Sequence, residues 1–197
     1  MRIGIYCGSF DPPHLGHLIL PSCAFDEFNL DKIIYVPSYI SVNKSKHYAS
    51  AFDRYAMLKL LLKNYPLFTI EDYEIKQKRL VYTFETITYL KEKYDLNKKE
   101  TYLFIGADWV KELNNWKNFD IIRENINFLV FSRNNIDINI LEKLSFFNMK
   151  ESEFLILNKN FDVSSSEIRN LIKENKQFSH FLTESVYKYI LDKGLYI

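Results

Sequence analysis

The stretch that decides the fold is RIGIYCGSFDPPHLGH, residues 2–17 of the chain. Its first part, residues 2–7, is a short apolar run that predicts a buried strand, and a glycine and a serine end it. A helix is expected from about His14 to about Phe28, where Pro21 should start a new turn or kink the helix. A strand that passes through a tight loop into a helix is the first step of an α/β fold.

The rest of the chain repeats this alternation. Further strands are expected at residues 33–36, 67–70, 102–105, 128–131 and 154–157, and helices around residues 55–62, 83–94, 165–173 and 183–192. Strands that alternate with helices pair in parallel through right-handed crossovers. We therefore expect one domain over residues 1–197, a Rossmann-like doubly wound, mainly parallel sheet flanked by helices. Such sheets bind ligands beyond the carboxyl ends of their strands.

Composition excludes several classes of function. The 197 residues carry 26 Lys and Arg against 25 Asp and Glu, a formal net charge of +1. Without a basic excess, nucleic-acid binding by bulk electrostatics is not expected. The sequence contains no apolar run of 18 residues, so no membrane-spanning helix is predicted. Two cysteines, Cys7 and Cys23, are too few for a disulfide framework and fit a reducing compartment, so we expect a cytoplasmic protein.

The loop after the first strand holds the residues best suited to phosphate chemistry. Gly8 and Ser9 let backbone N–H groups approach a phosphate without a bulky side chain in the way. His14 and His17 lie three positions apart at the expected helix start, and we expect both imidazoles on one face over its positive end. A single histidine at such a place is usually an ordinary surface residue. Two together favour hydrogen bonding to a phosphate whose negative charge grows in a transition state.

The segments Gly8-Ser9-Phe10-Asp11-Pro12 and His14-Leu15-Gly16-His17 resemble the motif of the nucleotidyltransferase superfamily. Within it, residues 3–196 are similar to the bacterial nicotinate/nicotinamide mononucleotide adenylyltransferases. The resemblance implies transfer of an adenylyl group from ATP to a pyridine mononucleotide, with release of pyrophosphate, in NAD biosynthesis. Two departures stand out. Cys7 replaces the family's first glycine, and only Pro37 and Lys44 match the family's second loop.

The resemblance also implies a set of site residues. Four are expected to act in catalysis: His14, His17, Lys44 and Arg169. The expected ATP contacts are Gly8, Ser9, Phe10, His14, His17, Gly106, Asp108, Arg133, Ser165, Ser166 and Arg169. The expected mononucleotide contacts are Ser9, Lys44, Thr83, Thr86 and Trp116.

Several of these residues also have a purely structural interpretation. Thr83 would serve equally as a helix cap, and Trp116 as core packing. Ser164 and Glu167 spell a capping box, which explains those two residues without a ligand but leaves Arg169 unexplained. Lys44 could be a solvated loop lysine, and Arg54 reads as a structural arginine.

No pattern of metal ligands is present, so we expect Mg²⁺ to arrive with ATP and no resident metal. The expected partners are ATP and a pyridine mononucleotide, without nucleic acid or membrane, and a homo-oligomer is left open. Two other functions stay open. One is a related transferase such as a phosphopantetheine adenylyltransferase or a cytidylyl enzyme, and the other is a catalytically silent nucleotide sensor.

Of the two pyridine mononucleotides, the nicotinic acid form is the expected substrate. Its carboxylate would be bound by the N–H groups at the helix start near Thr83. Glu85 is the nearest acidic residue and is expected to point away.

Overall fold

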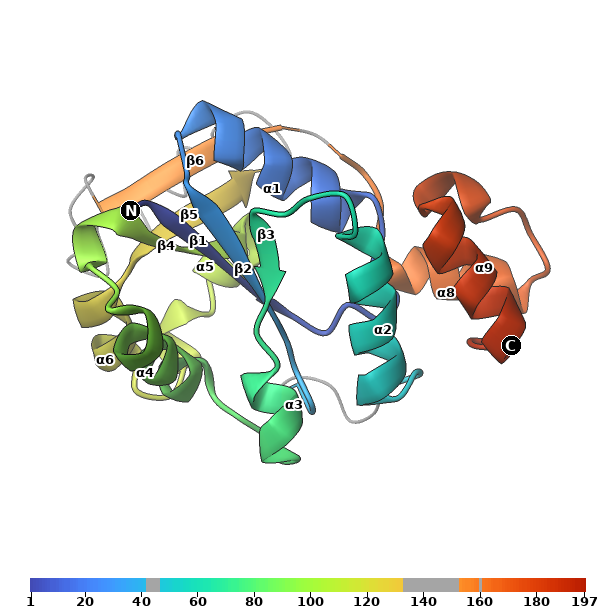
Figure 1. The fold of residues 1–197 in the computed structure, drawn as a ribbon, viewed down its shortest axis with the longest axis horizontal. Coiled ribbons are helices and arrows are strands. Elements are labelled where there is room, and N and C mark those ends of the chain that lie inside the picture. Colours follow the sequence, from blue (N-terminus) through green and yellow to red (C-terminus); the bar gives the residue numbers. More distant parts are fainter. Residues whose placement is uncertain (42–46, 133–152, 160) are drawn as a thin grey trace. The chain divides into compact units, whose positions relative to one another are not determined.

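The computed structural model describes residues 1–41, 47–132, 153–159 and 161–197 (Figure 1). Two predicted site residues, Lys44 and Arg133, therefore lie outside the described residues. The chain divides into two compact units that interleave in sequence. Unit 1 comprises Met1–Cys7, Cys23–Ile34 and Tyr82–Asn160, and unit 2 comprises Gly8–Ser22, Tyr35–Val81 and Phe161–Ile197. Each is described by itself below.

The described strands form a six-stranded sheet in the order β3-β2-β1-β4-β5-β6. Their bounds are Ile3–Gly8 (β1), Lys32–Pro37 (β2), Phe68–Ile70 (β3), Thr101–Gly106 (β4), Asn127–Ser132 (β5) and Phe154–Asn158 (β6). This is the order of a doubly wound Rossmann-type sheet. The predicted fold class is confirmed, and each of the six predicted strands is present with ends displaced by about one residue.

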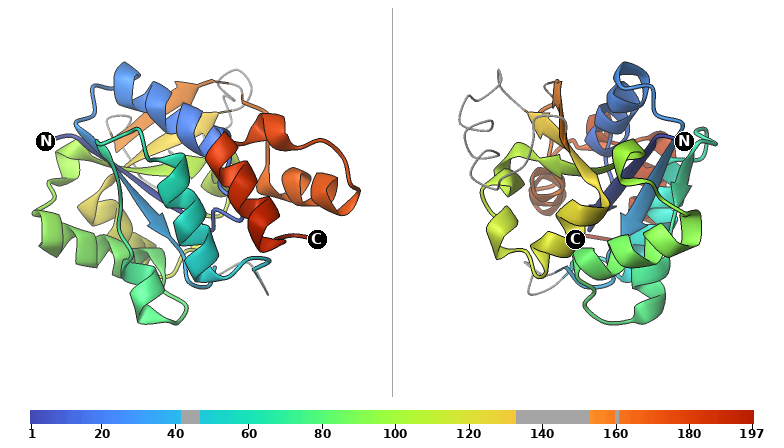
Figure 2. Two further views of the ribbon diagram at one scale, coloured as in Figure 1. Left: turned by 45° about the vertical axis from the view of Figure 1, so that its right-hand side comes forward. Right: turned by 90° about the vertical axis from the view of Figure 1, so that its left-hand side faces the viewer.

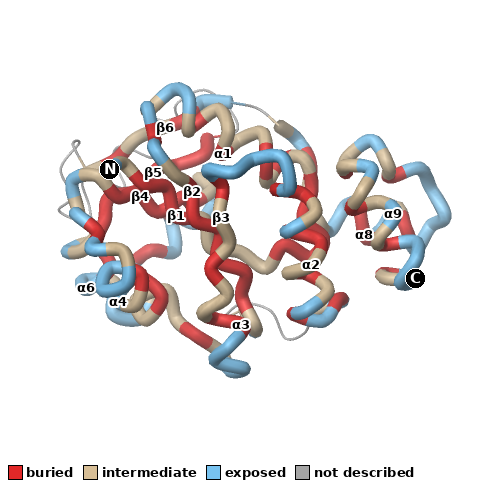
Figure 3. Tube along the Cα trace, viewed as in Figure 1, coloured by how far each residue is buried: buried red, intermediate tan, exposed pale blue. Residues whose placement is uncertain are grey.

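The core of unit 1 is the parallel part of the sheet. Ile3 on β1 pairs with Thr101 on β4, and Phe104 on β4 pairs with Leu129 on β5. Strands β4 and β5 are buried along most of their length, and β1 is buried over its first half (Figure 3). Strands covered on both faces read as continuous apolar runs, which is why they were recognisable in the sequence. Packing favours glycine at position 4, because a Cβ on Gly4 would lie 2.3 Å from the Phe104 ring.

The described residues of unit 1 include the helices α4 (Thr83–Tyr94), α5 (Ala107–Val110) and α6 (Phe119–Asn125). The sequence predicts the bounds of α4 correctly but misses α5 and α6, which are too short to develop a helical periodicity. Helix α4 packs against α6, where Lys91 donates a hydrogen bond to the Asn125 side chain. Asp95 ends α4 in the left-handed conformation.

Unit 2 contains α2 (Ala51–Leu61), α3 (Tyr73–Gln77), α8 (Ser165–Lys173) and α9 (Glu184–Lys193). Ser50, Ser164 and Thr183 cap α2, α8 and α9 through their side-chain oxygens. Helices α2 and α9 lie side by side (Figure 2), and the Tyr189 hydroxyl donates to Asp53 Oδ1 at 2.9 Å. Among the described residues, every helix is too short or too polar to span a bilayer.

Helix α1 (Gly16–Glu27) contains Pro21 and continues through it, so no new helix begins at the proline. Proline has no N–H to donate to the carbonyl four residues earlier, which is that of His17. The Tyr35 hydroxyl donates to that carbonyl instead, at 2.9 Å. Tyr35 is fully buried on β2, so a side chain from the sheet supplies the hydrogen bond that the helix lacks.

Replacing Tyr35 with Phe should therefore destabilise the protein by about 1–2 kcal/mol, because a buried carbonyl loses its donor. In a Pro21→Ala background the helix itself can donate to His17, and the same substitution should cost clearly less. Urea denaturation of the four proteins of this double-mutant cycle measures the difference. Equal costs in both backgrounds would contradict this account of Pro21.

Candidate functional site

Two stacked imidazoles form the centre of the candidate site in unit 2. The His14 and His17 ring centroids lie 3.7 Å apart with an interplanar angle of 29°. The backbone N–H of His14 donates to His17 Nδ1 at 3.1 Å, so a neutral His17 carries its proton on Nε2. Helix α1 begins at Gly16, later than expected, and the two histidines lie on either side of that residue. The predicted proximity of the rings is present, with His14 before the helix.

Small and buried neighbours hold these rings. A Cβ on Gly16 would lie 3.1 Å from the His14 ring and 3.0 Å from Val163, so a larger residue here would push these side chains by a few tenths of an ångström. Phe10 has φ 51° and is buried, and the edge of its ring packs on His17 with centroids 5.0 Å apart. The Phe10 side chain thus supports the imidazole from inside, and its expected contact with ATP stays a prediction.

Arg54 ties the loop after β1 to the loop after β2. Its guanidinium is fully buried and donates to the carbonyls of Ser9 at 2.6 Å, Ser38 at 2.7 Å and Tyr39 at 3.0 Å. The Ser9 hydroxyl is hydrogen bonded to Ser41 Oγ at 3.0 Å. This is the structural role that the sequence suggested for Arg54, and it positions the backbone at Ser9.

The Asp11 side chain accepts several hydrogen bonds within the site, and the sequence alone predicted no role for it. Its Oδ2 accepts from the Tyr48 N–H at 2.8 Å, and its Oδ1 accepts from the Ala49 N–H at 3.1 Å and the Tyr196 hydroxyl at 2.9 Å. The His47 ring lies 3.5 Å away. Burial alone would raise the pKa of Asp11, but hydrogen bonds from His47, Tyr48, Tyr196 and Ala49 lower it to about 2. Asp11 is therefore a buried carboxylate ion.

The start of helix α8 is joined to the same loop. The Ser164 hydroxyl accepts from the Glu167 N–H at 3.1 Å, which confirms the capping interpretation of Ser164. The Ser165 hydroxyl donates to the Pro12 carbonyl at 2.9 Å. Ser164, the capping residue, and Ser165, a predicted ligand residue, thus have different hydrogen-bond partners at the start of α8.

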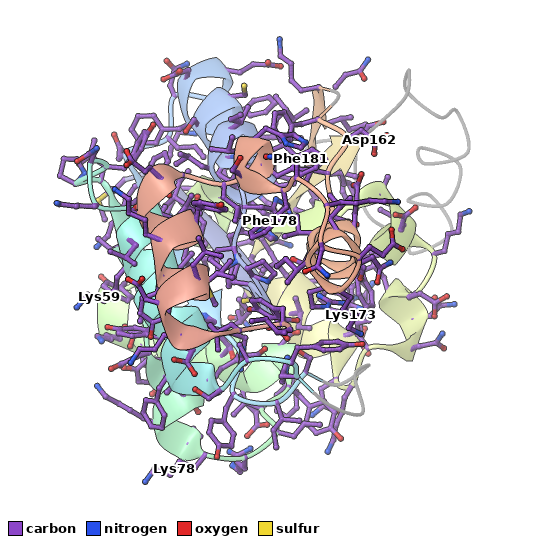
Figure 4. All side chains as sticks on the ribbon, turned by 90° about the vertical axis from the view of Figure 1, so that its right-hand side faces the viewer. Lys59, Lys78, Asp162, Lys173, Phe178 and Phe181 are labelled. Atoms are coloured by element: carbon purple, nitrogen blue, oxygen red, sulfur yellow. The ribbon has the colours of Figure 1, made fainter. Side chains whose placement is uncertain are left out.

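Arg169 is buried one turn into α8 and is held at both ends of its guanidinium. It donates to the Asp11 carbonyl at 2.6 Å and to Ser166 Oγ at 2.9 Å, which confirms that it reaches the start of its own helix. The Tyr48 ring lies over it, 4.3 Å from the guanidinium carbon, with Lys173 5.1 Å from the same ring. Lys173 is labelled at the end of α8 in Figure 4. Helix α8 thus brings two cationic side chains to the Tyr48 ring, and one of them is hydrogen bonded to the loop that carries the two histidines.

In unit 1 the end of β4 leads directly into helix α5. Gly106 is the last residue of β4, and a Cβ there would meet Trp109 at 3.8 Å, an ordinary contact. Nothing in the described part of unit 1 therefore excludes a side chain at Gly106, and the space beside its backbone is open. Asp108 is exposed in the first turn of α5.

Trp116 lies beside a second tryptophan that the sequence analysis missed. The Trp109 and Trp116 rings meet edge to face, with centroids 6.3 Å apart, and Trp109 is 41% exposed. The next residue, Lys117, places its ammonium group 4.3 Å from the centroid of the Tyr82 ring. Two indoles and a cation are thus presented near the start of α4, where Tyr82 lies.

The start of α4 differs from the expectation in two respects. Tyr82, not Thr83, is the N-cap residue, and Thr83 is the first residue of the helix. Glu85 does not point away, because its Oε1 accepts from the Tyr82 N–H at 3.0 Å and so lies at the helix start. Thr86 is fully buried in α4, which leaves no surface to support its predicted contact with the mononucleotide.

The structure thus gathers the predicted residues in two groups. Unit 2 holds Gly8, Ser9, Phe10, His14, His17, Ser165, Ser166 and Arg169, and unit 1 holds Gly106, Asp108, Thr83, Thr86 and Trp116. Trp109 and Lys117 each adjoin a predicted residue and could have been found from that position. Nothing in the sequence connects Tyr196 with Asp11, which are 185 positions apart.

Comparison with known proteins identifies the family. The cytidylyltransferase-like family model matches residues 5–171. A probable nicotinate-nucleotide adenylyltransferase of Endomicrobium trichonymphae is 35% identical, with 99% of this chain and 98% of the relative covered. Another, from Clostridium botulinum strain Hall, is 37% identical with 96% of each chain covered.

A solved structure gives the same fold. The nicotinic acid mononucleotide adenylyltransferase of Plasmodium falciparum, complexed with NaAD, superposes with a TM-score of 0.81 at 20% identity and covers 99% of this chain and 97% of its own. Its identity is too low to carry more than the fold. The full-length relatives carry more, and the chain belongs to the nicotinate-nucleotide adenylyltransferases of the cytidylyltransferase-like family.

Proposed function

We propose that this protein transfers the adenylyl group of ATP to nicotinate mononucleotide, forming the dinucleotide and pyrophosphate. The observation that carries the proposal is the stacked pair His14 and His17 at the start of α1, on the loop whose Asp11 carbonyl accepts from the buried Arg169, in a chain whose full-length relatives carry this name. The same relatives favour this activity over that of a phosphopantetheine or cytidylyl enzyme.

The reaction needs charge stabilisation and positioning more than proton transfer. The 5′-phosphate of the mononucleotide is already anionic, and one of its oxygens attacks the α-phosphorus of ATP. The bond from that phosphorus to the bridging oxygen breaks, and pyrophosphate leaves with the electron pair. His17, with its proton on Nε2, and the adjoining His14 would donate to the α-phosphate oxygens as their charge grows.

The remaining predicted residues divide by chemistry. Ser165, Ser166 and Arg169 would bind the leaving pyrophosphate at the start of α8, where helix N–H groups and a guanidinium meet. Lys44 would add a cation there, and Arg133 a contact with the nucleotide. Gly106 and Asp108 would contact the nucleotide after β4, and Trp116 would stack on the pyridine ring.

Mg²⁺ would enter as part of the substrate, bound to the ATP phosphates, and would neutralise phosphate charge there. Asp11, the carboxylate nearest the histidines in sequence, does not fit a resident metal because both of its oxygens accept hydrogen bonds from the chain itself. In the described residues no three His, Cys, Asp or Glu side chains converge.

The preference for the acid over the amide would depend on the balance of charge at the start of α4. Glu85 brings a negative charge to this helix start, which works against a carboxylate ligand. Lys117, beside Tyr82, brings the compensating positive charge. Together with the N–H groups of the helix start near Thr83, it would favour the nicotinate carboxylate.

The test of the function is pyrophosphate release from ATP with a panel of acceptors: nicotinate mononucleotide, nicotinamide mononucleotide, phosphopantetheine and none. Turnover with a pyridine mononucleotide supports the proposal. Turnover only with phosphopantetheine would assign another transferase, and ATP binding without turnover would assign a sensor.

For His17→Ala, kcat should fall by at least about 100-fold, because a donor to the developing phosphate charge is lost. Steady-state kinetics with both substrates measures the effect, and circular dichroism checks the fold. His180→Ala removes an exposed histidine of the same unit and is the control. Near-normal turnover in a folded His17→Ala protein would refute the mechanism.

For Arg169→Ala, we expect a higher KM for ATP and weaker pyrophosphate binding, with little change for the mononucleotide. Calorimetric titration with each ligand separates these effects. Lys176→Ala, at an exposed ion pair just beyond α8, serves as the control. If ATP affinity stayed the same, the start of α8 would be a capped helix end and nothing more.

Wild-type protein should have a higher kcat/KM for nicotinate mononucleotide than for the amide. In Lys117→Met the ratio of acid to amide should fall by about fivefold, the upper range for an exposed charge pair. Lys111→Met, an exposed lysine of the same region, should leave the ratio unchanged. A wild-type value for the amide equal to or above that for the acid would contradict the substrate assignment.

A further inference from the structure

Tyr196 lies outside every predicted motif, yet its hydroxyl donates a hydrogen bond to Asp11 in the loop after β1. It is buried, with 6% of its surface exposed, and its OH donates to Asp11 Oδ1 at 2.9 Å. The backbone at Tyr196 has φ 71°, a conformation that non-glycine residues rarely adopt. The preceding helix α9 ends at Gly194, also in the left-handed region. The chain thus takes an unfavourable path that brings this hydroxyl to Asp11.

Asp11 connects Tyr196 to two other segments of the chain. Its carboxylate accepts the N–H groups of Tyr48 and Ala49, and its own carbonyl accepts Arg169 at 2.6 Å. Tyr48 in turn lies over the Arg169 guanidinium. A single residue, Asp11, therefore binds both Arg169 and the backbone of Tyr48, whose ring lies over Arg169.

The Tyr196 hydroxyl is suited to this position because it does not ionise. Burial and the charge of Asp11 both raise the pKa of Tyr196 well above its usual value, so it remains a donor. Without it, the Ala49 N–H, at 3.1 Å, would be the remaining donor to Oδ1 of this buried carboxylate among the described residues. A buried ion that loses a donor relaxes its surroundings or takes up a proton.

We propose that Tyr196 is a positioning residue for ATP: through Asp11 it holds Tyr48 and Arg169 in the arrangement that receives the triphosphate. The proposal rests on the proposed function for the identity of the ligand. It adds a residue outside every motif of the site, and it predicts an effect on ATP and not on the mononucleotide.

Tyr196→Phe should weaken ATP binding by about tenfold, the usual effect of removing one hydrogen bond to a buried charged group. The mononucleotide KM should change by less than about twofold, since Arg169 is assigned to the leaving pyrophosphate. Calorimetric titration with MgATP measures the affinity for ATP, and steady-state kinetics gives a separate KM for each of the two substrates. A variant that is only less stable would not lose affinity for ATP while keeping its KM for the mononucleotide.

Tyr189→Phe is a matched control. Tyr189 also lies near the end of the chain and donates to an aspartate at 2.9 Å, but that aspartate is Asp53 on α2, away from Arg169. It should lower thermal stability without changing ATP affinity. An equal loss of ATP affinity in both variants would overturn the proposal.

A double-mutant cycle tests whether the effect passes through Asp11. In an Asp11→Asn background, Tyr196→Phe should change ATP affinity by less than about twofold, because the charge that needs the donor is gone. An undiminished effect in that background would overturn the proposal, as would unchanged ATP affinity in Tyr196→Phe itself.

A second variant decides the matter if Tyr196→Phe does not fold. Tyr48 is 57% exposed, so Tyr48→Leu should fold while removing the ring from Arg169. It should also weaken ATP binding, and no change would overturn the proposal. Because titration with MgATP needs no turnover, these results remain readable if the protein proves inactive with pyridine mononucleotides. That outcome would refute the proposed function alone.

Discussion

The interaction on which unit 2 depends is the burial of the Asp11 carboxylate with its hydrogen-bond donors. A buried ion is strongly unfavourable unless its oxygens are satisfied, so the chain must bring donors to it. They come from the segment before α2 and from Tyr196, while Arg169 binds the carbonyl of the same residue. The loop of Asp11, the segment before α2 and Tyr196 are far apart in the sequence and are held together because one carboxylate requires donors.

This arrangement makes the residues assigned to phosphate chemistry part of the framework of unit 2. Arg169 and Ser165 contact the backbone of the loop after β1, and His17 takes part in the hydrogen bonding of α1 through its carbonyl and Tyr35. Groups that are held in place before a ligand arrives can stabilise a transition state without reorganising. Substitutions here will therefore affect both stability and activity, which is why matched controls matter.

Unit 1 handles its candidate residues differently. Trp109, Lys117 and Asp108 lie on the surface, on or near short helices, while the residues beneath them on β4 are buried. Exposed aromatic rings and a solvated cation contribute to recognition but little to stability. We therefore expect substitutions at these surface residues to leave the fold of unit 1 intact.

Local patterns along the chain were enough to predict the alternation of strands and helices, the doubly wound class and the loops that hold most candidate residues. Apolar runs such as the one in β4, the cap at Ser164 and the spacing of His14 and His17 are local features, because neighbouring residues alone produce them. Prediction from the sequence failed where the local structure depended on residues that are distant along the chain. Pro21 is tolerated in α1 because of Tyr35, and Glu85 turns back to the Tyr82 N–H at a helix start that lacks a capping side chain. Only the tertiary structure joined Tyr196 to Asp11, because the requirement to satisfy a buried charge acts through space and leaves no pattern along the chain.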